Sequence, residues 1–355
     1  MVAAEKLELH PIGPLSRSCD VSLAPRARFA MEGVETMVRY WGGVVPILIG
    51  ASIAAPALAG SPAGTGLVGE GGKLLATGGV STVEGAAGGG LVPWALITGY
   101  ESRDSIGVTV HETYVPLHDF TLHTPGVAVG FYDRLELSYA ADLFTVDNNN
   151  LLAGGIQKGF TFHQDVFGAK LRVIGDAVYD QDSLLPQIAI GTQFKRNDNA
   201  NVLATVGAKN ANGADFYLAA TKLFLNYSLL VNTTLRFTKA NQFGLLGFGG
   251  PRNDDYQPEF EGSLAYLVSR NFAVGAEYRM KPNNLDKFAG ALPIGPEQAA
   301  YDIFAAYFPT KNVSITAAFV DLGHIADVSL APLGINTSLE PHKQMGGYLS
   351  LQLAY

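Results

Sequence analysis

Residues 228–239 read SLLVNTTLRFTK and residues 272–281 read FAVGAEYRMK, and both stretches alternate between two kinds of side chain. In the first, leucine, valine and phenylalanine take most odd-numbered positions, whereas asparagine, threonine and arginine take most even-numbered ones. Successive side chains of a β-strand point to opposite faces of the sheet. This period of two therefore predicts strands that have one apolar face and one polar face.

The same alternation recurs from residue 73 to the last residue, in short segments that turn residues separate. Fourteen segments give the even strand number that single-chain bacterial barrels have. The alternative is twelve strands, with residues 60–90 serving as a plug or a periplasmic lead. We predict strands over 73–84, 92–101, 105–114, 119–132, 134–146, 165–178, 187–196, 215–225, 228–239, 258–269, 272–281, 298–308, 312–321 and 344–355.

The connections between these segments separate a soluble sandwich from a membrane barrel, which alternation alone does not. Every second connection is short, with one exception, and the intervening set is long. Short turns at one end and long loops at the other are typical of outer-membrane barrels. We therefore predict an all-β antiparallel transmembrane barrel with short periplasmic turns and long extracellular loops. The short set is 102–104, 133–134, 179–186, 226–227, 270–271 and 309–311, and the long set includes 147–164, 197–214, 240–257, 282–297 and 322–343.

Composition excludes several classes of protein. Hydrophobic residues make up 48% of the chain and charged residues only 16%. After residue 60 no stretch offers the roughly 18 apolar residues of a helical membrane span. Cys19 is the only cysteine, so thiolate metal sites are not expected, and we predict neither a metal nor a cofactor. The net charge of −8 argues against a nucleic-acid partner.

An export signal is predicted over residues 37–59. Arg39 precedes an apolar run from Val44 to Ala55, and Ala57-Leu58-Ala59 is a cleavage site that leaves Gly60 as the first mature residue. Residues 1–36 are interpreted as an upstream extension from an early start. Residues 60–72 are a glycine-rich lead or plug, and residues 73–355 form the barrel. The expected location is the outer membrane of a Gram-negative bacterium.

The last strand is consistent with this location. Leu349, Leu351, Leu353 and Tyr355 alternate with smaller or polar residues, and an aromatic residue ends the chain. This pattern resembles the C-terminal signal that the barrel-assembly machinery reads. The expected partners are that machinery and outer-membrane lipid.

Charged residues share the polar face of the predicted strands. They either line a pore, where opposed charges act on polar solutes, or form a network of ion pairs that fills the barrel. The sequence leaves both alternatives open. The loop 240–257 is unusually apolar and is expected either to enter the lumen or to insert at the membrane interface. The candidate pore-lining residues are Glu136, Lys170, Arg172, Lys195, Arg236, Glu259, Glu261, Glu277, Arg279 and Asp302, with Asp142 and Lys281 of the same parity.

One region gathers histidines and carboxylates. His111, His118, Asp119 and His123 lie close in sequence, and a histidine beside a carboxylate is a possible general base with its orienting acid. No serine stands in a recognisable nucleophile motif. These four residues are therefore weak catalytic candidates, and polar residues of a surface loop are the simpler interpretation.

Several strings carry a family resemblance. They are VGFYDRLELS (129–138), YDQDSLLPQIAIG (179–191), NQFGLLGFGG (241–250) and GAEYRMKP (275–282), together with the leading stretch 72–100. The chain resembles an uncharacterised proteobacterial family, domain of unknown function 3034, over nearly all of residues 65–355. The resemblance implies an exported, outer-membrane protein and implies no activity.

Three functions are compatible with the sequence. The first is a passive or weakly selective pore for small polar solutes. The second is an outer-membrane enzyme that acts on lipid or envelope material through the region of His111 to His123. The third is a structural or assembly barrel that is linked to export of a surface polymer.

Overall fold

The computed structural model describes residues 73–147 and 156–355. The predicted export signal, the extension before it and residues 60–72 lie outside the described residues. In the described part of the chain no helix has the length and hydropathy to cross a membrane.

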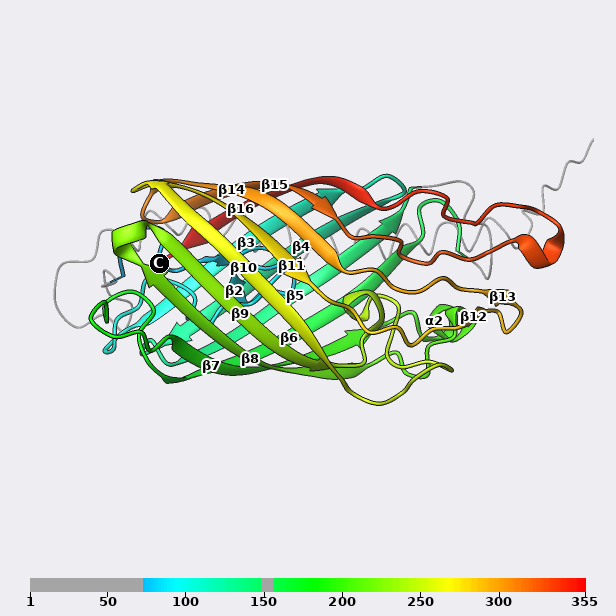
Figure 1. Ribbon diagram of the computed structural model, residues 1–355, viewed down its shortest axis with the longest axis horizontal. Helices are drawn as coiled ribbons and strands as arrows, with labels where there is room; N and C mark the ends of the chain where they lie inside the picture. The colour runs from blue at the N-terminus through cyan, green and yellow to red at the C-terminus, as the bar shows by residue number, and fades with distance from the viewer. Residues whose placement is uncertain (1–72, 148–155) are drawn as a thin grey trace, which may run out of the picture. The chain divides into compact units, whose positions relative to one another are not determined.

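Twelve antiparallel strands form a closed barrel in which each strand pairs with the next and β16 pairs with β3. Closure leaves no free edge, so every strand satisfies its backbone hydrogen bonds within the sheet. Figure 1 shows the strands tilted across the long axis of the barrel. They are β3 (Ile106–Pro116), β4 (Phe120–Phe131), β5 (Leu135–Val146), β6 (Thr161–Ile174), β7 (Gln187–Asn197), β8 (Gly213–Phe224), β9 (Leu229–Thr238), β10 (Gln257–Ser269), β11 (Phe272–Arg279), β14 (Ala300–Thr310), β15 (Val313–Asp321) and β16 (Met345–Ala354).

The prediction of fourteen strands is wrong, and its alternative of twelve is confirmed. The predicted strands 73–84 and 92–101 do not enter the barrel wall. They contain only two short strands, β1 (Val80–Ser81) and β2 (Ala87–Gly88), which pair with each other. Glycine, alanine, serine and threonine make up about half of residues 73–101, and bulky apolar residues such as Val92, Trp94 and Leu96 are buried and do not face lipid. The stretch is almost entirely buried.

The two faces of the wall are the reverse of those of a soluble protein. Large apolar side chains on the outer face are exposed, for example Leu218 at 45% and Leu264 at 54%. Charged side chains on the inner face are buried, for example Lys195 at 0% and Arg236 at 1%. An apolar exterior around a charged interior is the pattern of a barrel whose outside contacts lipid.

Loop length differs between the two ends of the barrel. At one end the connections are 132–134, 175–186, 225–228, 270–271 and 311–312, and the 3-10 turn η1 (Leu225–Tyr227) occupies one of them. At the other end, 117–119 is short, whereas 147–160, 198–212, 239–256, 280–299 and 322–344 are long. These long loops carry α2 (Ala200–Val206), the β12 (Lys287–Phe288) and β13 (Leu292–Pro293) hairpin, and the 3-10 turns η2 (Asn241–Gly244) and η3 (Ala331–Leu333). In Figure 1 α2, β12 and β13 lie at the end opposite the C-terminus.

Small inward-facing residues leave room inside the wall. A Cβ on Gly130 would lie 2.4 Å from the carbonyl oxygen of Thr98, and a Cβ on Gly107 would lie 2.4 Å from Oε2 of Glu101. A Cβ on Gly85 would lie 3.1 Å from the Cβ of Ala140. The inner surface of β3 to β5 therefore accepts a second layer of backbone, which a wall of large side chains would exclude.

Candidate functional site

A segment that we call the plug, residues 73–105, occupies the lumen. It enters and leaves at the short-turn end, where the backbone N–H of Tyr100 donates to the carbonyl of Tyr355 at 3.2 Å. Its two arms lie close together there, because a Cβ on Gly78 would be 3.2 Å from the carbonyl oxygen of Gly99. The plug is thus a hairpin-like insert that does not pass through the barrel.

Wall side chains hold the plug through its backbone. Glu136 accepts hydrogen bonds from the N–H groups of Ala87 at 3.1 Å and Thr98 at 2.8 Å. Lys170 donates to the carbonyls of Ala87 and Trp94, both at 3.1 Å. Lys170 also pairs with Glu136 at 3.1 Å. This one ion pair therefore binds both N–H groups and carbonyl groups of the plug backbone.

A second set of contacts lies on the opposite wall. Glu277 accepts from the N–H groups of Leu91 at 2.6 Å and Val92 at 3.3 Å, and its other oxygen accepts from the hydroxyl of Ser263 at 2.6 Å. Trp94 donates from its indole nitrogen to Ser263 at 2.9 Å. These buried polar groups of the plug and the wall therefore satisfy one another.

Glu84 is the charged centre of the plug. Its carboxylate pairs with Lys195, with Arg279 at 2.7 Å and with Arg236 at 3.6 Å, and the side chain is 1% exposed. Burial alone would raise the pKa of Glu84, but the three cations hold it well below its ordinary value. Glu84 is therefore ionised, and it is the only charged residue between Lys73 and Glu101 in the sequence.

The three cations are also held by the wall itself. Arg236 donates to Glu261 at 2.5 Å and to Gln193 at 2.6 Å. Asp215 pairs with Lys195 at 2.6 Å and with Arg236 at 3.4 Å, and Glu261 also pairs with Arg279 at 3.1 Å. The positions of the three cations thus depend on wall carboxylates as well as on Glu84.

The loop 240–250, which we call the cap loop, closes the lumen from the long-loop end. Its Phe243 carbonyl accepts from Lys195 at 2.9 Å, and its Phe243 ring lies 4.2 Å from the guanidinium of Arg279. Gln242 and Phe243 have φ angles of +46° and +62°, a left-handed conformation that non-glycine residues rarely adopt. The sequence left two placements open for this loop, the lumen and the membrane interface. The structure places it in the lumen.

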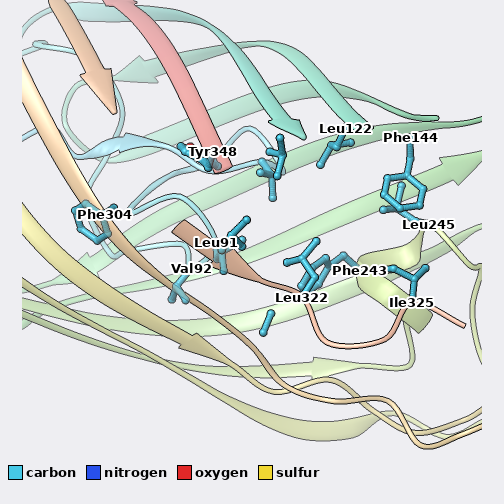
Figure 2. Packing of buried hydrophobic residues seen from close by; sticks show 14 of the residues in the cluster. Leu91, Val92, Leu122, Phe144, Phe243, Leu245, Phe304, Leu322, Ile325 and Tyr348 are labelled. Carbon is cyan, nitrogen blue, oxygen red and sulfur yellow. The ribbon is translucent and has the colours of Figure 1, made fainter. Parts of the chain in front are cut away.

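Plug and cap loop meet in one apolar cluster. Figure 2 shows Leu91 and Val92 of the plug, and Phe243 and Leu245 of the cap loop, among its buried side chains. The lumen is therefore closed by two separate segments that touch the same cations and the same apolar cluster.

At the short-turn rim a group that we call the base clasp fastens the plug. Lys73 pairs with Glu101 at 2.5 Å and with Asp133 at 3.3 Å. Arg172 binds Asp133 and pairs with Asp176 at 3.0 Å, so the clasp links both plug arms to two rim connections.

The base clasp predicts a pH dependence. Burial raises the pKa of Glu101 to about 7 from its ordinary 4.5, although Lys73 opposes the rise. The folded protein therefore holds a proton that the unfolded chain releases. This contribution to stability is complete below pH 4.5, declines as the pH rises, and is lost above about pH 7. We expect the midpoint of heat-modifiable gel mobility to fall across this window, and to fall less in Glu101→Gln. An equal fall of the midpoint with pH in the wild-type protein and in Glu101→Gln would contradict this contribution of Glu101 to stability.

The structure disperses the histidine region. His111 faces the lumen and is 1% exposed, and its register partner is Gly126. His123 is exposed on the outer face and contacts Glu112 at 3.4 Å. His118 and Asp119 contact each other at 3.0 Å in the connection 117–119, where the His118 ring also lies 4.7 Å from the ring of His342, tilted by 52°. These residues do not form one catalytic group.

The predicted charged positions lie on the inner wall, except for Arg172 and for Lys281, which is buried in the connection that follows β11. Arg172 belongs to the base clasp at the rim and is only partly buried. Lys73, Glu84 and Glu101 are not identified as site residues from the sequence, because they fall in the predicted wall strands 73–84 and 92–101. The signal that could have identified Glu84 is that it is a single carboxylate in a glycine-rich stretch. The inward and buried positions are Glu136, Asp142, Lys170, Lys195, Arg236, Glu259, Glu261, Glu277, Arg279 and Asp302.

A family model described as "Protein of unknown function (DUF3034)" matches residues 77–352. The chain belongs to this family. The match includes most of the plug and the barrel strands up to residue 352, within β16. No protein of curated function matches the chain.

Solved structures with some similarity to this family member are outer-membrane barrels. The KdgM porin has 11% identity and a TM-score of 0.41, over 70% of this chain and 99% of that one. The NanC porin has 8% identity and a TM-score of 0.42, over 69% and 98%. Outer membrane phospholipase A from Escherichia coli has 10% identity and a TM-score of 0.36, over 72% and 94%.

Proposed function

We propose that this protein is a gated channel for small polar solutes in the outer membrane of a Gram-negative bacterium, and that the structure is its closed state. The observation that carries the proposal is that a separable insert fills the lumen. A purely structural barrel of this kind would be filled by its own wall side chains. Here small wall residues make the space that the plug occupies.

Two features make the plug removable. Its ends lie at the same rim, so withdrawal requires no threading through the barrel. Its contacts with Glu136, Lys170 and Glu277 are hydrogen bonds to backbone groups, which water can replace. A lumen freed of the plug would present a charged wall, which suits polar solutes and disfavours apolar ones.

The geometry allows both inserts to be excised. Joining Gly78 to Gly99 removes most of the plug across a gap that is already closed in the fold. Joining Lys239 to Gly249 removes the cap loop, because the N–H of Gly249 donates to the carbonyl of Lys239 at 2.8 Å. We expect the intact protein to be closed in a planar bilayer and the doubly excised protein to show steady conductance. The single excisions identify which insert limits flow.

Heat-modifiable gel mobility must first show that the excised protein is a folded barrel. A folded, doubly excised barrel without conductance would overturn the channel proposal. Steady conductance from the intact protein, equal to that of the doubly excised protein, would overturn the proposal that the structure is a closed state.

A further inference from the structure

The cations around Glu84 form a site with an unbalanced charge. Lys195, Arg236 and Arg279 supply three positive charges, and the wall carboxylates within ion-pair distance are Asp215 and Glu261. The wall part of the cluster therefore carries one positive charge in excess. Glu84 from the plug supplies the balancing negative charge. An uncompensated buried charge is costly, so the site requires an anion when the plug leaves.

Asp142, another buried carboxyl group of the wall, does not fill this role. Asp142 accepts hydrogen bonds from Thr124 at 2.9 Å and Gln164 at 3.1 Å, and it lies beyond ion-pair distance from Lys195.

The geometry around Glu84 fits a carboxylate. The two terminal nitrogens of Arg279 donate to the two oxygens of Glu84, at 2.7 Å and 3.1 Å. This planar two-point contact is the arrangement in which a guanidinium binds a carboxylate best. Lys195 adds a third donor to one oxygen, and Arg236 lies 3.6 Å from the other.

The site is also preorganised. Arg236 keeps its bonds to Glu261 and Gln193 without Glu84, and Lys195 keeps its bonds to Asp215 and to the carbonyl of Phe243. Donors that are already fixed lose little conformational freedom when a ligand binds. A free carboxylate would therefore find these donors in place after the plug withdraws.

We propose that Lys195, Arg236 and Arg279 form a lumenal binding site for the carboxylate of a small organic acid, and that Glu84 occupies this site as an internal ligand in the closed state. The inference rests on the proposed channel, since such an acid would be a solute that competes with the plug. The binding site itself is testable without any conductance.

Chemical rescue of Glu84→Ala tests the site. The protein is refolded from urea into detergent at constant ionic strength with sodium acetate, sodium chloride, sodium phosphate or neutral acetamide. We expect acetate to raise both the refolding yield and the thermal midpoint of this variant by the largest margin. The wild-type protein should respond much less, because Glu84 already fills the site. Since yield is a readout, poor folding without acetate still gives a result.

Two variants control for general effects of acetate. In Glu84→Ala/Lys195→Met the two remaining cations, Arg236 and Arg279, are balanced by the charges of the two wall carboxylates. This variant should therefore refold without acetate, and acetate should not change its yield or thermal midpoint. In Glu101→Ala the lost carboxylate faced Lys73 of the base clasp, and no rescue is expected.

Four outcomes would overturn the proposal: no response of Glu84→Ala to acetate, an equal response to acetamide, a stronger response to phosphate, or an equal response of the double variant. Failure of the channel is separate. Acetate rescue without conductance from the doubly excised barrel would retain the site and reject the channel.

Discussion

In the protein from which the cap loop has been excised, we expect Glu84→Gln to conduct ions in a planar bilayer under conditions in which the same protein with Glu84 intact is closed by its plug. Glutamine keeps the shape of the side chain but removes the charge that three buried cations share. Removing one partner of a buried ion pair costs about 3–5 kcal/mol. Because the wall holds the cations by other bonds, the loss falls mainly on plug binding, and the open fraction rises by on the order of a hundredfold or more.

Glu259→Gln is the matched control for this prediction. Glu259 is another buried carboxyl group of the inner wall, at 6% exposure, and it forms no ion pair with Lys195, Arg236 or Arg279. We expect this variant to remain closed. Equal conductance from the two variants, or none from a folded Glu84→Gln barrel, would contradict the role of Glu84 as the latch.

We expect Leu264→Arg to lower the free energy of unfolding in lipid vesicles by about 2–4 kcal/mol, the cost of a cation on the lipid face near the bilayer midplane. Leu264 lies near the middle of β10 and points outward, with 54% exposure. The physical reason is that an arginine there leaves water for hydrocarbon. The measurement is urea unfolding of the vesicle-bound protein.

Val268→Arg is the control for Leu264→Arg. Val268 is also outward-facing and 54% exposed, but it lies one residue before the end of β10 at the short turns. There the cost falls to about 0–1 kcal/mol, because the charge reaches the membrane interface. Equal destabilisation by the two substitutions would contradict the membrane orientation of the barrel.

The local alternation of side chains was sufficient to predict the strands of the barrel wall. In β9 the alternation around Val231 and Arg236 predicted which side chains face outward and which inward, and the register with β10 follows it. Turn residues such as those at 270–271 predicted the short connections. Strand alternation has a period of two, so it is readable within a few residues. The same reasoning failed for residues 73–101, where small side chains alternate without distinguishing a wall strand from a plug.

The amino-acid sequence by itself determined the transmembrane barrel, the two faces of its strands and the ends at which long and short loops lie. These properties depend on neighbouring residues. Only the tertiary structure decided that the plug and the cap loop fill the lumen and that Glu84 pairs with three wall cations there. Glu84 is 111 residues from Lys195 and 195 residues from Arg279 along the chain. Such contacts arise when twelve strands close into a barrel, and no local pattern records which distant side chains then share its interior.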